Sequence, residues 1–287
     1  MKKIVYLNGE YMKEDEAKVS IFDRGFVFGD GVYEVVPVVR GVVLDKEPFL
    51  QRFDRSLSEL ELGWPMSQDQ FLEMIDELIK RNDLSEGGVY MQVTRGVAPR
   101  DFGYPKDVPA TVMAFIFSKE IINSEKAKQG VKVVTVPDIR WKRRDIKSIA
   151  LLGQCIAKEQ ACKQGAYEGW MVEDGFVTEG TASSAYIVKD GKIITRPLSN
   201  SILPGIRRKI LLELAEKNDE IELEQRPFTV EEALDADEAF LSSATTFVLP
   251  IIEIDGKTIG DGKPGKIAKM MRQAYIDSAL EVAGVTL

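Results

Sequence analysis

The sequence contains no histidine among its 287 residues. This absence excludes the Ser-His and Cys-His nucleophile systems and every metal site that depends on a histidine ligand. Proton transfer near neutral pH must then be carried out by lysine, tyrosine, carboxylates or a bound cofactor. We expect no metal site, and the search for a catalytic group narrows to these side chains.

Cysteine is almost as scarce. The two that are present, Cys155 and Cys162, are seven residues apart in a segment with a helical pattern. That spacing suits neither a zinc knuckle nor a redox pair. We expect both to be buried, reduced thiols.

Two further absences concern location and partners. The net charge is -8, and binding to nucleic acid needs clustered Lys and Arg, so a polyanionic partner is disfavoured. No run of residues approaches the length of a membrane span, and the basic N-terminus is not followed by the apolar core of a signal peptide. The sequence therefore predicts a cytoplasmic protein that binds neither nucleic acid nor membrane.

The residues that are present predict a globular chain of two domains. With 44% hydrophobic and 29% charged residues the chain can build a full core, and its length exceeds the usual size of one core. We expect a small N-terminal α/β domain over 1–118, a polar linker over 119–130 and a larger, β-rich C-terminal domain with helices over 131–287. The fold class is α+β, with α and β mixed.

Local patterns locate most elements. Strands are expected at 4–11, 32–44, 89–95, 111–117 and 131–137, and helices at 49–60, at 67–82 with Ser67 as N-cap, and at 148–161 with Ser148 as cap. Three Asp-Gly pairs, at 174–175, 190–191 and 255–256, predict hairpins. A purely parallel sheet is therefore disfavoured. The glycines of G-F-V-F-G-D-G, residues 25–31, predict tight turns, because their spacing does not match a dinucleotide loop.

Lys147 is the first candidate for a reactive group. Taken alone, a lysine is most often an exposed charge, and the chain has 38 Lys and Arg residues. Lys147 differs in lying at an expected junction of strand and helix, just after Lys142, Arg143 and Arg144. Repulsion from these cations and partial burial would favour the neutral amine that a nucleophilic lysine needs.

Two other features could serve a flat anionic ligand. Glu179 lies among small residues in V-T-E-G-T-A-S-S, where a carboxylate could approach a protonated ring nitrogen closely. Gly205 follows Pro204 just before a helical run, and the N–H groups at a helix start form a generic phosphate site. A solvated carboxylate and an ordinary helix entry are the commoner interpretations of these two patterns.

Six segments taken together carry a resemblance to a known family. D-R-G-F-V-F-G-D-G-V-Y-E-V-V, V-T-R-G-V-A-P-R, D-I-R-W-K-R-R-D-I-K-S-I-A-L-L-G, V-T-E-G-T-A-S-S, L-P-G-I and V-L-P-I-I-E-I-D-G-K follow one another as in the fold-type IV, or class IV, aminotransferases that depend on pyridoxal 5'-phosphate (PLP). The match extends over nearly the whole chain. Within this family the chain most resembles the bacterial enzymes that act on D-amino acids.

The resemblance implies a role for each matching residue. Lys147 would form the internal aldimine with PLP and carry the proton, and Glu179 would keep the pyridine nitrogen protonated. The other residues that the resemblance assigns to cofactor binding are Arg52, Leu203, Gly205, Ile206, Arg207, Ser243, Ala244 and Thr245. Those assigned to the substrate are Tyr33, Val35, Phe28, Arg100 and Phe102, with Arg100 reaching across from the second subunit of a homodimer.

The sequence departs from the family pattern at several of these positions. A histidine usually follows the carboxylate-binding arginine by two residues, and Phe102 stands there instead. Phe49 replaces another usual histidine, Ala244 replaces a threonine of the phosphate site, and Arg207 replaces a smaller residue. The departure at Phe102 puts carboxylate affinity and stereochemical preference in question.

The implied activity is transamination of D-amino acids such as D-alanine and D-glutamate, with 2-oxoglutarate or pyruvate as acceptor, through a pyridoxamine intermediate. Alternatives within the fold are a branched-chain L-amino-acid aminotransferase, an (R)-amine transaminase and an aminodeoxychorismate lyase. A non-catalytic metabolite-binding protein is the alternative from another class. The joint presence of Lys147, Glu179 and Arg52 argues against it.

Overall fold

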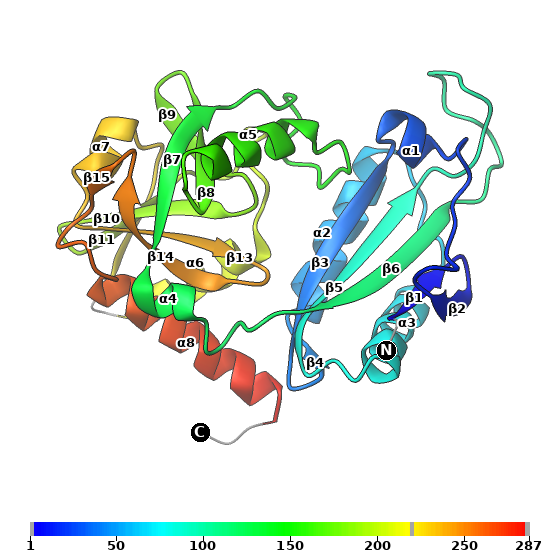
Figure 1. Cartoon of the computed structure of the whole chain (residues 1–287), viewed down its shortest axis with the longest axis horizontal. Helices are drawn as coiled ribbons and strands as arrows, with labels where there is room; N and C mark the ends of the chain where they lie inside the picture. Colours follow the sequence, from blue (N-terminus) through cyan, green and yellow to red (C-terminus); the bar gives the residue numbers. More distant parts are fainter. Residues whose placement is uncertain (1–2, 219–220, 285–287) are drawn as a thin grey trace. The chain divides into compact units, whose positions relative to one another are not determined.

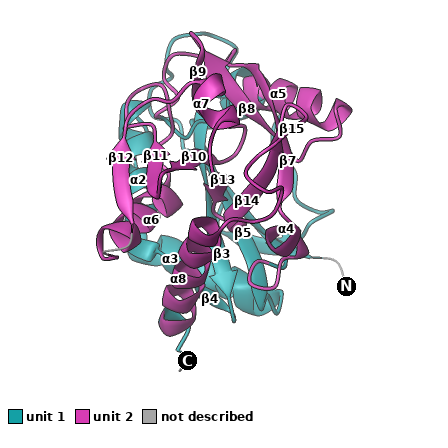
Figure 2. Ribbon diagram, turned by 90° about the vertical axis from the view of Figure 1, so that its left-hand side faces the viewer, with its two compact units in different colours: residues 1–120, 146–151, 282–285 teal, residues 121–145, 152–281, 286–287 magenta. Residues whose placement is uncertain are grey.

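The computed structural model describes residues 3–218 and 221–284, which form two compact units (Figure 2). Unit 1 takes in the chain up to Glu120 and the segment Ile146–Leu151, and unit 2 takes in Ile121–Asp145 and Leu152–Glu281. Each unit has its own sheet and its own helices (Figure 1). The mixed α/β fold class is thus confirmed.

Unit 1 is built on a six-stranded antiparallel sheet with the strand order β2-β1-β6-β5-β3-β4. Its strands are β1 (Ile4–Leu7), β2 (Glu10–Lys13), β3 (Gly31–Val39), β4 (Val42–Val43), β5 (Glu86–Thr94) and β6 (Thr111–Ser118). Its helices are α1 (Arg24–Phe28), α2 (Lys46–Glu59) and α3 (Gln68–Arg81).

Helices α2 and α3 are amphipathic and pack their apolar stripes on the sheet, since apolar residues recur every three or four positions. In α2 these are Phe49, Leu50, Phe53 and Leu57, and in α3 they are Phe71, Met74, Ile75, Leu78 and Ile79. The apolar residue Phe49, which stands where the family has a histidine, is completely buried in this layer. It contributes to the core and has no polar role here.

Unit 2 is built on a nine-stranded mixed sheet with the order β12-β11-β10-β13-β14-β7-β8-β9 and with β15 paired to β14. Its strands are β7 (Val131–Pro137), β8 (Glu168–Glu173), β9 (Phe176–Gly180), β10 (Ser184–Lys189), β11 (Lys192–Thr195), β12 (Glu222–Gln225), β13 (Glu238–Ser243), β14 (Phe247–Ile254) and β15 (Lys257–Thr258). Its helices are α4 (Glu125–Gln129), α5 (Leu152–Lys163), α6 (Ile206–Glu216), α7 (Val230–Leu234) and α8 (Lys266–Val282). Trp170, Phe228, Leu241 and Leu249 are among the residues of its core.

The three Asp-Gly hairpins are confirmed. They join β8 to β9, β10 to β11 and β14 to β15, and both residues of each pair have positive φ, from 50° to 53° for Asp and from 76° to 80° for Gly. This is the type I′ turn, which matches the right-handed twist of the flanking strands.

The prediction that Ser148 caps a helix is wrong. Helix α5 begins only at Leu152, because the residues before it are not helical and Ser148 forms an antiparallel bridge with Val32 of β3. Residues 146–151 therefore belong to unit 1, whereas the sequence placed Lys147 in the C-terminal domain. The G-F-V-F-G-D-G stretch also differs, since it forms the short helix α1 and a left-handed turn at Gly29.

Two other expectations differ from the structure. Cys155 and Cys162 are exposed, because the buried face of α5 consists of Ala157 and Ala161, one turn apart. The segment 119–130, expected as a linker, contains α4, whose Ala127 packs into the core of unit 2. Within residues 3–218 and 221–284, no helix has the length and apolar character needed to cross a membrane.

The start of α3 generates a stability prediction. The Ser67 hydroxyl accepts from Gln70 N–H at 3.2 Å and the Gln70 side chain accepts from Ser67 N–H at 3.0 Å, a complete capping box. We expect Ser67→Ala to lower the free energy of unfolding by about 1 kcal/mol in urea titrations. Ser124→Ala is the matched control, because Ser124 stands at the N-cap of α4 without a side-chain cap bond. Equal losses for both variants would contradict the capping role.

Candidate active site

The backbone of Lys147 is fixed on two sides within unit 1. Tyr33 N–H donates to the Lys147 carbonyl at 3.0 Å, and Ile149 N–H donates to the Gly31 carbonyl at 3.0 Å, so the segment runs beside β3. On the other side Lys147 N–H donates to the Ser56 hydroxyl of α2 at 3.3 Å. No sequence pattern predicted the contact with Ser56 or the pairing of this segment with β3.

The amine of Lys147 lies over an aromatic ring. Its Nζ is 4.2 Å from the ring centroid of Tyr33, and the side chain is half-buried. Tyr33 in turn stacks on Tyr90 at 5.5 Å and Tyr90 on Phe115 at 4.8 Å, so the rings form a ladder across β3, β5 and β6. Burial raises the pKa of Tyr90, which keeps this phenol neutral. Unit 1 thus brings Lys147 and Tyr33 together, as the resemblance implied, and Val35 shares their half-buried face of β3.

Arg52 is held by a carboxylate that the sequence did not single out. Glu34 lies on the opposite face of β3 from Tyr33 and Val35, as strand alternation requires, and its side chain is fully buried. Arg52 donates from Nε and Nη2 to the two oxygens of Glu34, each at 2.7 Å. This bidentate pair orients the guanidinium that was expected to bind phosphate.

Arg100, Phe28 and Phe102 also meet within unit 1. The guanidinium of Arg100 is 5.6 Å from the ring centroid of Phe28 and 5.4 Å from that of Phe102. The two rings are 5.5 Å apart, and Phe102 is 77% exposed. Where the family has a histidine, this chain therefore has an exposed aromatic face against the arginine.

Glu179 is buried at the end of β9 in unit 2. Its Oε1 accepts from Arg140 Nη1 at 2.5 Å, and both of its oxygens lie within 3.2 Å of the N–H of Leu203. Burial raises the pKa of Glu179, while the Arg140 charge and the Leu203 N–H act in the opposite direction. Unit 2 thus brings together Glu179 and Leu203, two of the residues expected to contact the pyridine ring.

A chain of buried ion pairs extends from Glu179. Arg140 uses its other edge on Asp138, at 2.9 and 2.7 Å, and Asp138 lies 3.3 Å from Arg144. These partners hold the pKa of Asp138 below its ordinary value against the opposing effect of burial. Arg144 continues to Glu173 at 2.8 Å. Asp138 and Arg140 precede Lys147 in the sequence, but only the fold shows that they support Glu179.

The cations expected to repel the Lys147 amine are themselves neutralised. Lys142 pairs with Glu173 at 3.1 Å, Arg143 pairs with Asp145 at 3.1 Å, and Arg144 pairs with Glu173. Each of the three cations has a carboxylate partner within unit 2, and Glu173 is shared by Lys142 and Arg144. The cluster supports the loop geometry of unit 2 instead.

The start of α6 and the end of β13 meet at β10. Gly205 occupies the N-cap of α6 without a side-chain cap, and a Cβ added to it would lie 2.7 Å from Ser184 Oγ. Ser184 faces Ser242 in the β10–β13 register, next to Ser243, whose hydroxyl bonds to Thr246 at 2.7 Å. An uncapped helix start near several hydroxyls can bind an oxyanion. Ile206, Ala244 and Thr245 belong to the same two turns.

The side chain of Arg207 does not extend from the helix start. It is buried, and it donates from Nη1 to the hydroxyl of Tyr275 on α8, with the guanidinium 5.7 Å from that ring. The expected extra cation at the phosphate is therefore bonded within the core of unit 2. Its backbone N–H still belongs to the first turn of α6.

Sequence reasoning also missed Glu168, which supports the turn after Glu179. The buried carboxylate accepts from the Thr181 hydroxyl at 2.9 Å, from Ala182 N–H at 2.6 Å and from the Ser183 hydroxyl at 2.8 Å. No local pattern distinguishes Glu168 from a surface glutamate, since its three donors are brought to it by the return of the chain from β8 to β10.

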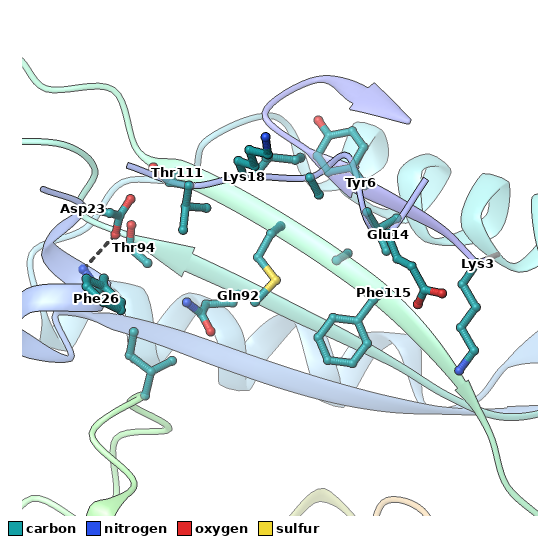
Figure 3. Close-up of a pocket in the computed structure, with 18 of the residues that line it drawn as sticks. Lys3, Tyr6, Glu14, Lys18, Asp23, Phe26, Gln92, Thr94, Thr111 and Phe115 are labelled. Carbon is teal, nitrogen blue, oxygen red and sulfur yellow. Dashed lines mark hydrogen bonds between the residues drawn. The ribbon is translucent and has the colours of Figure 1, made fainter. Parts of the chain in front are cut away.

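A separate cavity of about 720 Å³ lies on the sheet of unit 1 (Figure 3). Side chains from β1, β5, β6 and α1 and from the segment before α1 line it, among them Tyr6, Asp23, Phe26, Gln92, Thr94 and Phe115. Ile149 reaches it, but the lining includes none of the candidate site residues. The cavity therefore does not itself define the candidate site.

The family is established by comparison with known proteins. Residues 31–254 match the family model described as amino-transferase class IV, so the chain belongs to that family. The chain is 41% identical to the D-alanine aminotransferase of Staphylococcus haemolyticus over 94% of its own length and 96% of the relative's. It is 39% identical to that of Bacillus licheniformis over 99% of both chains.

Solved structures agree on the fold. A bacterial branched-chain amino acid aminotransferase with pyridoxamine 5'-phosphate superposes with a TM-score of 0.89 at 23% identity, covering 99% of this chain and 95% of that one. The branched-chain aminotransferase of Thermoproteus uzoniensis with norvaline gives 0.88 at 24% identity, covering 99% and 96%. The fold-type IV assignment is thereby confirmed.

The residues present fit PLP, the cofactor that the family uses. A buried carboxylate with a compensating arginine, Glu179 with Arg140, suits a protonated ring nitrogen. The uncapped start of α6, packed closely at Gly205, suits a phosphate. Lys147 supplies the primary amine that a carbonyl cofactor requires.

Glu168 generates a pH prediction. Burial raises the pKa of Glu168 above its ordinary value of 4.5 in the folded state. Because the folded state then holds the proton more tightly than the unfolded state, stability contributed by protonated Glu168 is lost as the pH rises from 4.5 through the raised pKa. We expect Glu168→Gln to gain free energy of unfolding relative to wild type as the pH rises above 4.5 in urea titrations.

Glu173→Gln is the matched control for this measurement. Hydrogen bonds from Arg144 and Lys142 lower the pKa of Glu173 to about 2, so it is ionised in both the folded and unfolded states over most of that pH range. Its difference from wild type should stay nearly constant over the same range of pH. A constant difference for Glu168→Gln as well would show that burial does not govern its proton.

Proposed function

We propose that this chain is a PLP-dependent aminotransferase for D-amino acids such as D-alanine and D-glutamate, with 2-oxoglutarate or pyruvate as acceptor. The observation that carries the proposal is the identity of 39–41% to D-alanine aminotransferases over nearly the whole of both chains. The branched-chain enzymes share the fold at 22–24% identity, which supports the architecture alone.

Lys147 is the residue that we assign to covalent attachment and proton transfer. PLP, when bound, supplies an electron sink for the charge left when the α-C–H bond of the amino acid breaks. The Lys147 amine would take a proton from the α-carbon of the amino donor. In the second half-reaction it would give a proton to the α-carbon of the new amino acid. The hydrogen-bonded backbone of Lys147 and the contact of its Nζ with the Tyr33 ring limit the amine to a small region, which supports this role.

The assignment of the cofactor-binding residues draws on the contacts within unit 2. Glu179 would accept a hydrogen bond from the protonated pyridine nitrogen, and Arg140 compensates the burial of its charge. The N–H groups of Ile206 and Arg207 at the start of α6 and the turn Ser243–Thr245 would hold the phosphate. The phosphate role of Arg52, which lies in unit 1, stays a prediction from the resemblance. Leu203, whose N–H is bonded to Glu179, would pack on the ring.

The substrate carboxylate is assigned to Arg100 and Tyr33. Arg100 is exposed on its loop, which is what a residue that reaches into the site of a second subunit needs. We therefore include a homodimer in the proposal. The location in the cytoplasm stays a prediction.

The alternatives separate by substrate. We expect purified, PLP-loaded protein to be converted to its amino form by D-alanine at least about 100-fold faster than by L-alanine, L-leucine or an (R)-amine without a carboxylate, because the carboxylate site and its stereochemistry act together. Half-reaction absorbance spectra with each donor measure this. Conversion by L-leucine but by no D-amino acid would replace the proposal with the branched-chain alternative.

The role of Lys147 is tested by its removal. We expect Lys147→Ala to retain PLP noncovalently after gel filtration and to lose roughly 10³-fold or more in kcat with D-alanine. Borohydride should fix the cofactor to wild type at Lys147 and not to the variant. Lys163→Ala, at an exposed i,i+4 pair with Glu159 on α5, is the control with unchanged turnover. Turnover of Lys147→Ala near that of the control would refute the assignment.

A further inference from the structure

The loop between β5 and β6 (Figure 1) carries Arg100 and Phe102. The side chain of Arg24 holds its backbone at residues 101–103. Residues 99–104 are exposed. Arg24 of α1 donates from Nη1 to the Asp101 carbonyl at 2.6 Å and to the Gly103 carbonyl at 3.2 Å, and its Nη2 is 3.5 Å from the Phe102 carbonyl. One guanidinium thus contacts three successive carbonyls of an otherwise exposed loop.

Arg24 is itself fixed from the opposite edge. It is 3% exposed, and its Nε donates to Asp30 Oδ2 at 2.7 Å. Arg95 donates to the same carboxylate at 2.9 Å, and Arg24 N–H donates to the Gly96 carbonyl at 2.9 Å. Because a guanidinium is a rigid planar fork, holding its Nε edge on Asp30 aims its other nitrogens at the loop.

The same side chain also supports the aromatic pair under Arg100. The guanidinium carbon of Arg24 is 4.8 Å from the ring centroid of Phe28, which contacts both Phe102 and Arg100. Arg24 therefore fixes the backbone of the loop and one of the two rings against which the Arg100 guanidinium lies. A lysine could not reproduce this, since a single ammonium cannot engage Asp30 and successive carbonyls in one plane.

We propose that Arg24, anchored by Asp30, is a positioning residue that holds the loop bearing Arg100 and Phe102 in the conformation that grips the substrate carboxylate. Arg24 acts through the loop. The proposal rests on the proposed function, because the role of Arg100 toward a carboxylate belongs to it.

The test measures loop order and substrate affinity separately. In the PLP-loaded protein we expect Arg24→Met to raise hydrogen exchange at the Gly103 amide by about tenfold or more, because the hydrogen bond of this amide to Asp101 Oδ1 depends on the loop conformation that Arg24 holds. In steady-state assays with D-alanine we expect KM to rise about tenfold with kcat within about twofold, the pattern for loss of uniform binding. Arg24→Lys should restore little of either. Arg81→Met, which removes an exposed arginine of α3 paired with Glu77, is the control.

A second arm separates positioning from a general loss of structure. If Arg24 acts through Arg100, Arg24→Met should raise KM no further in an Arg100→Met background, since the effects of coupled residues are not additive. A full additional loss in that background, or unchanged exchange in the loop, would overturn the proposal. Where Arg24→Met does not fold, Asp30→Asn loosens the anchor isosterically, and wild-type exchange and KM for that variant would overturn it equally.

The outcomes also distinguish this proposal from the proposed function. If wild type fails to transaminate D-alanine, the proposed function fails. The hydrogen-exchange measurement still decides whether Arg24 orders the loop. If wild type is active and Arg24→Met behaves as Arg81→Met does, only the positioning role of Arg24 is refuted.

Discussion

The pairing of the Lys147 segment with β3 is the interaction on which the candidate chemistry depends. β4 is short and pairs only with Val38 and Val39, so it leaves the edge of β3 at Gly31–Tyr33 available for another partner. Residues 147–149 take that edge by main-chain hydrogen bonds. These bonds fix the backbone of Lys147 beside Tyr33, and its amine lies over the Tyr33 ring. The lysine is thereby held at a defined position on a rigid element.

Buried charges form the second constraint. The structure buries Glu34, Asp30, Asp138 and Glu179 together with their arginine partners, and a buried charge is tolerated only when it is paired. Each pair uses the rigid fork of an arginine. The arginine contacts a carboxylate with one part of the fork, and in Arg24 and Arg140 the rest of the fork points to a second group. A chain without histidine thus uses arginine geometry to orient its polar groups.

Much of the fold could be predicted from local patterns. The capping box at Ser67 and the three Asp-Gly turns act within four residues, so their physics is complete in the sequence. The prediction failed at Ser148, where a good capping residue is used in a long-range strand bridge, and at the exposed cysteines, where tertiary packing selected the alanine face of α5. In both cases a contact distant in the sequence overrode a local preference.

The sequence by itself determined the class of chemistry. Without histidine, proton transfer was left to lysine, tyrosine, carboxylates or a cofactor, and the ordered motifs indicated the family and its candidate lysine. Only the tertiary structure decided which groups support that chemistry. Glu34 pairs with Arg52, and Arg140 pairs with Glu179. Glu168 accepts hydrogen bonds from the turn that follows Glu179. Arg24 donates to the loop that carries Arg100. The reason is physical: each is a carboxylate or guanidinium with ordinary local surroundings, and its partner is defined only when the chain returns to it through the fold.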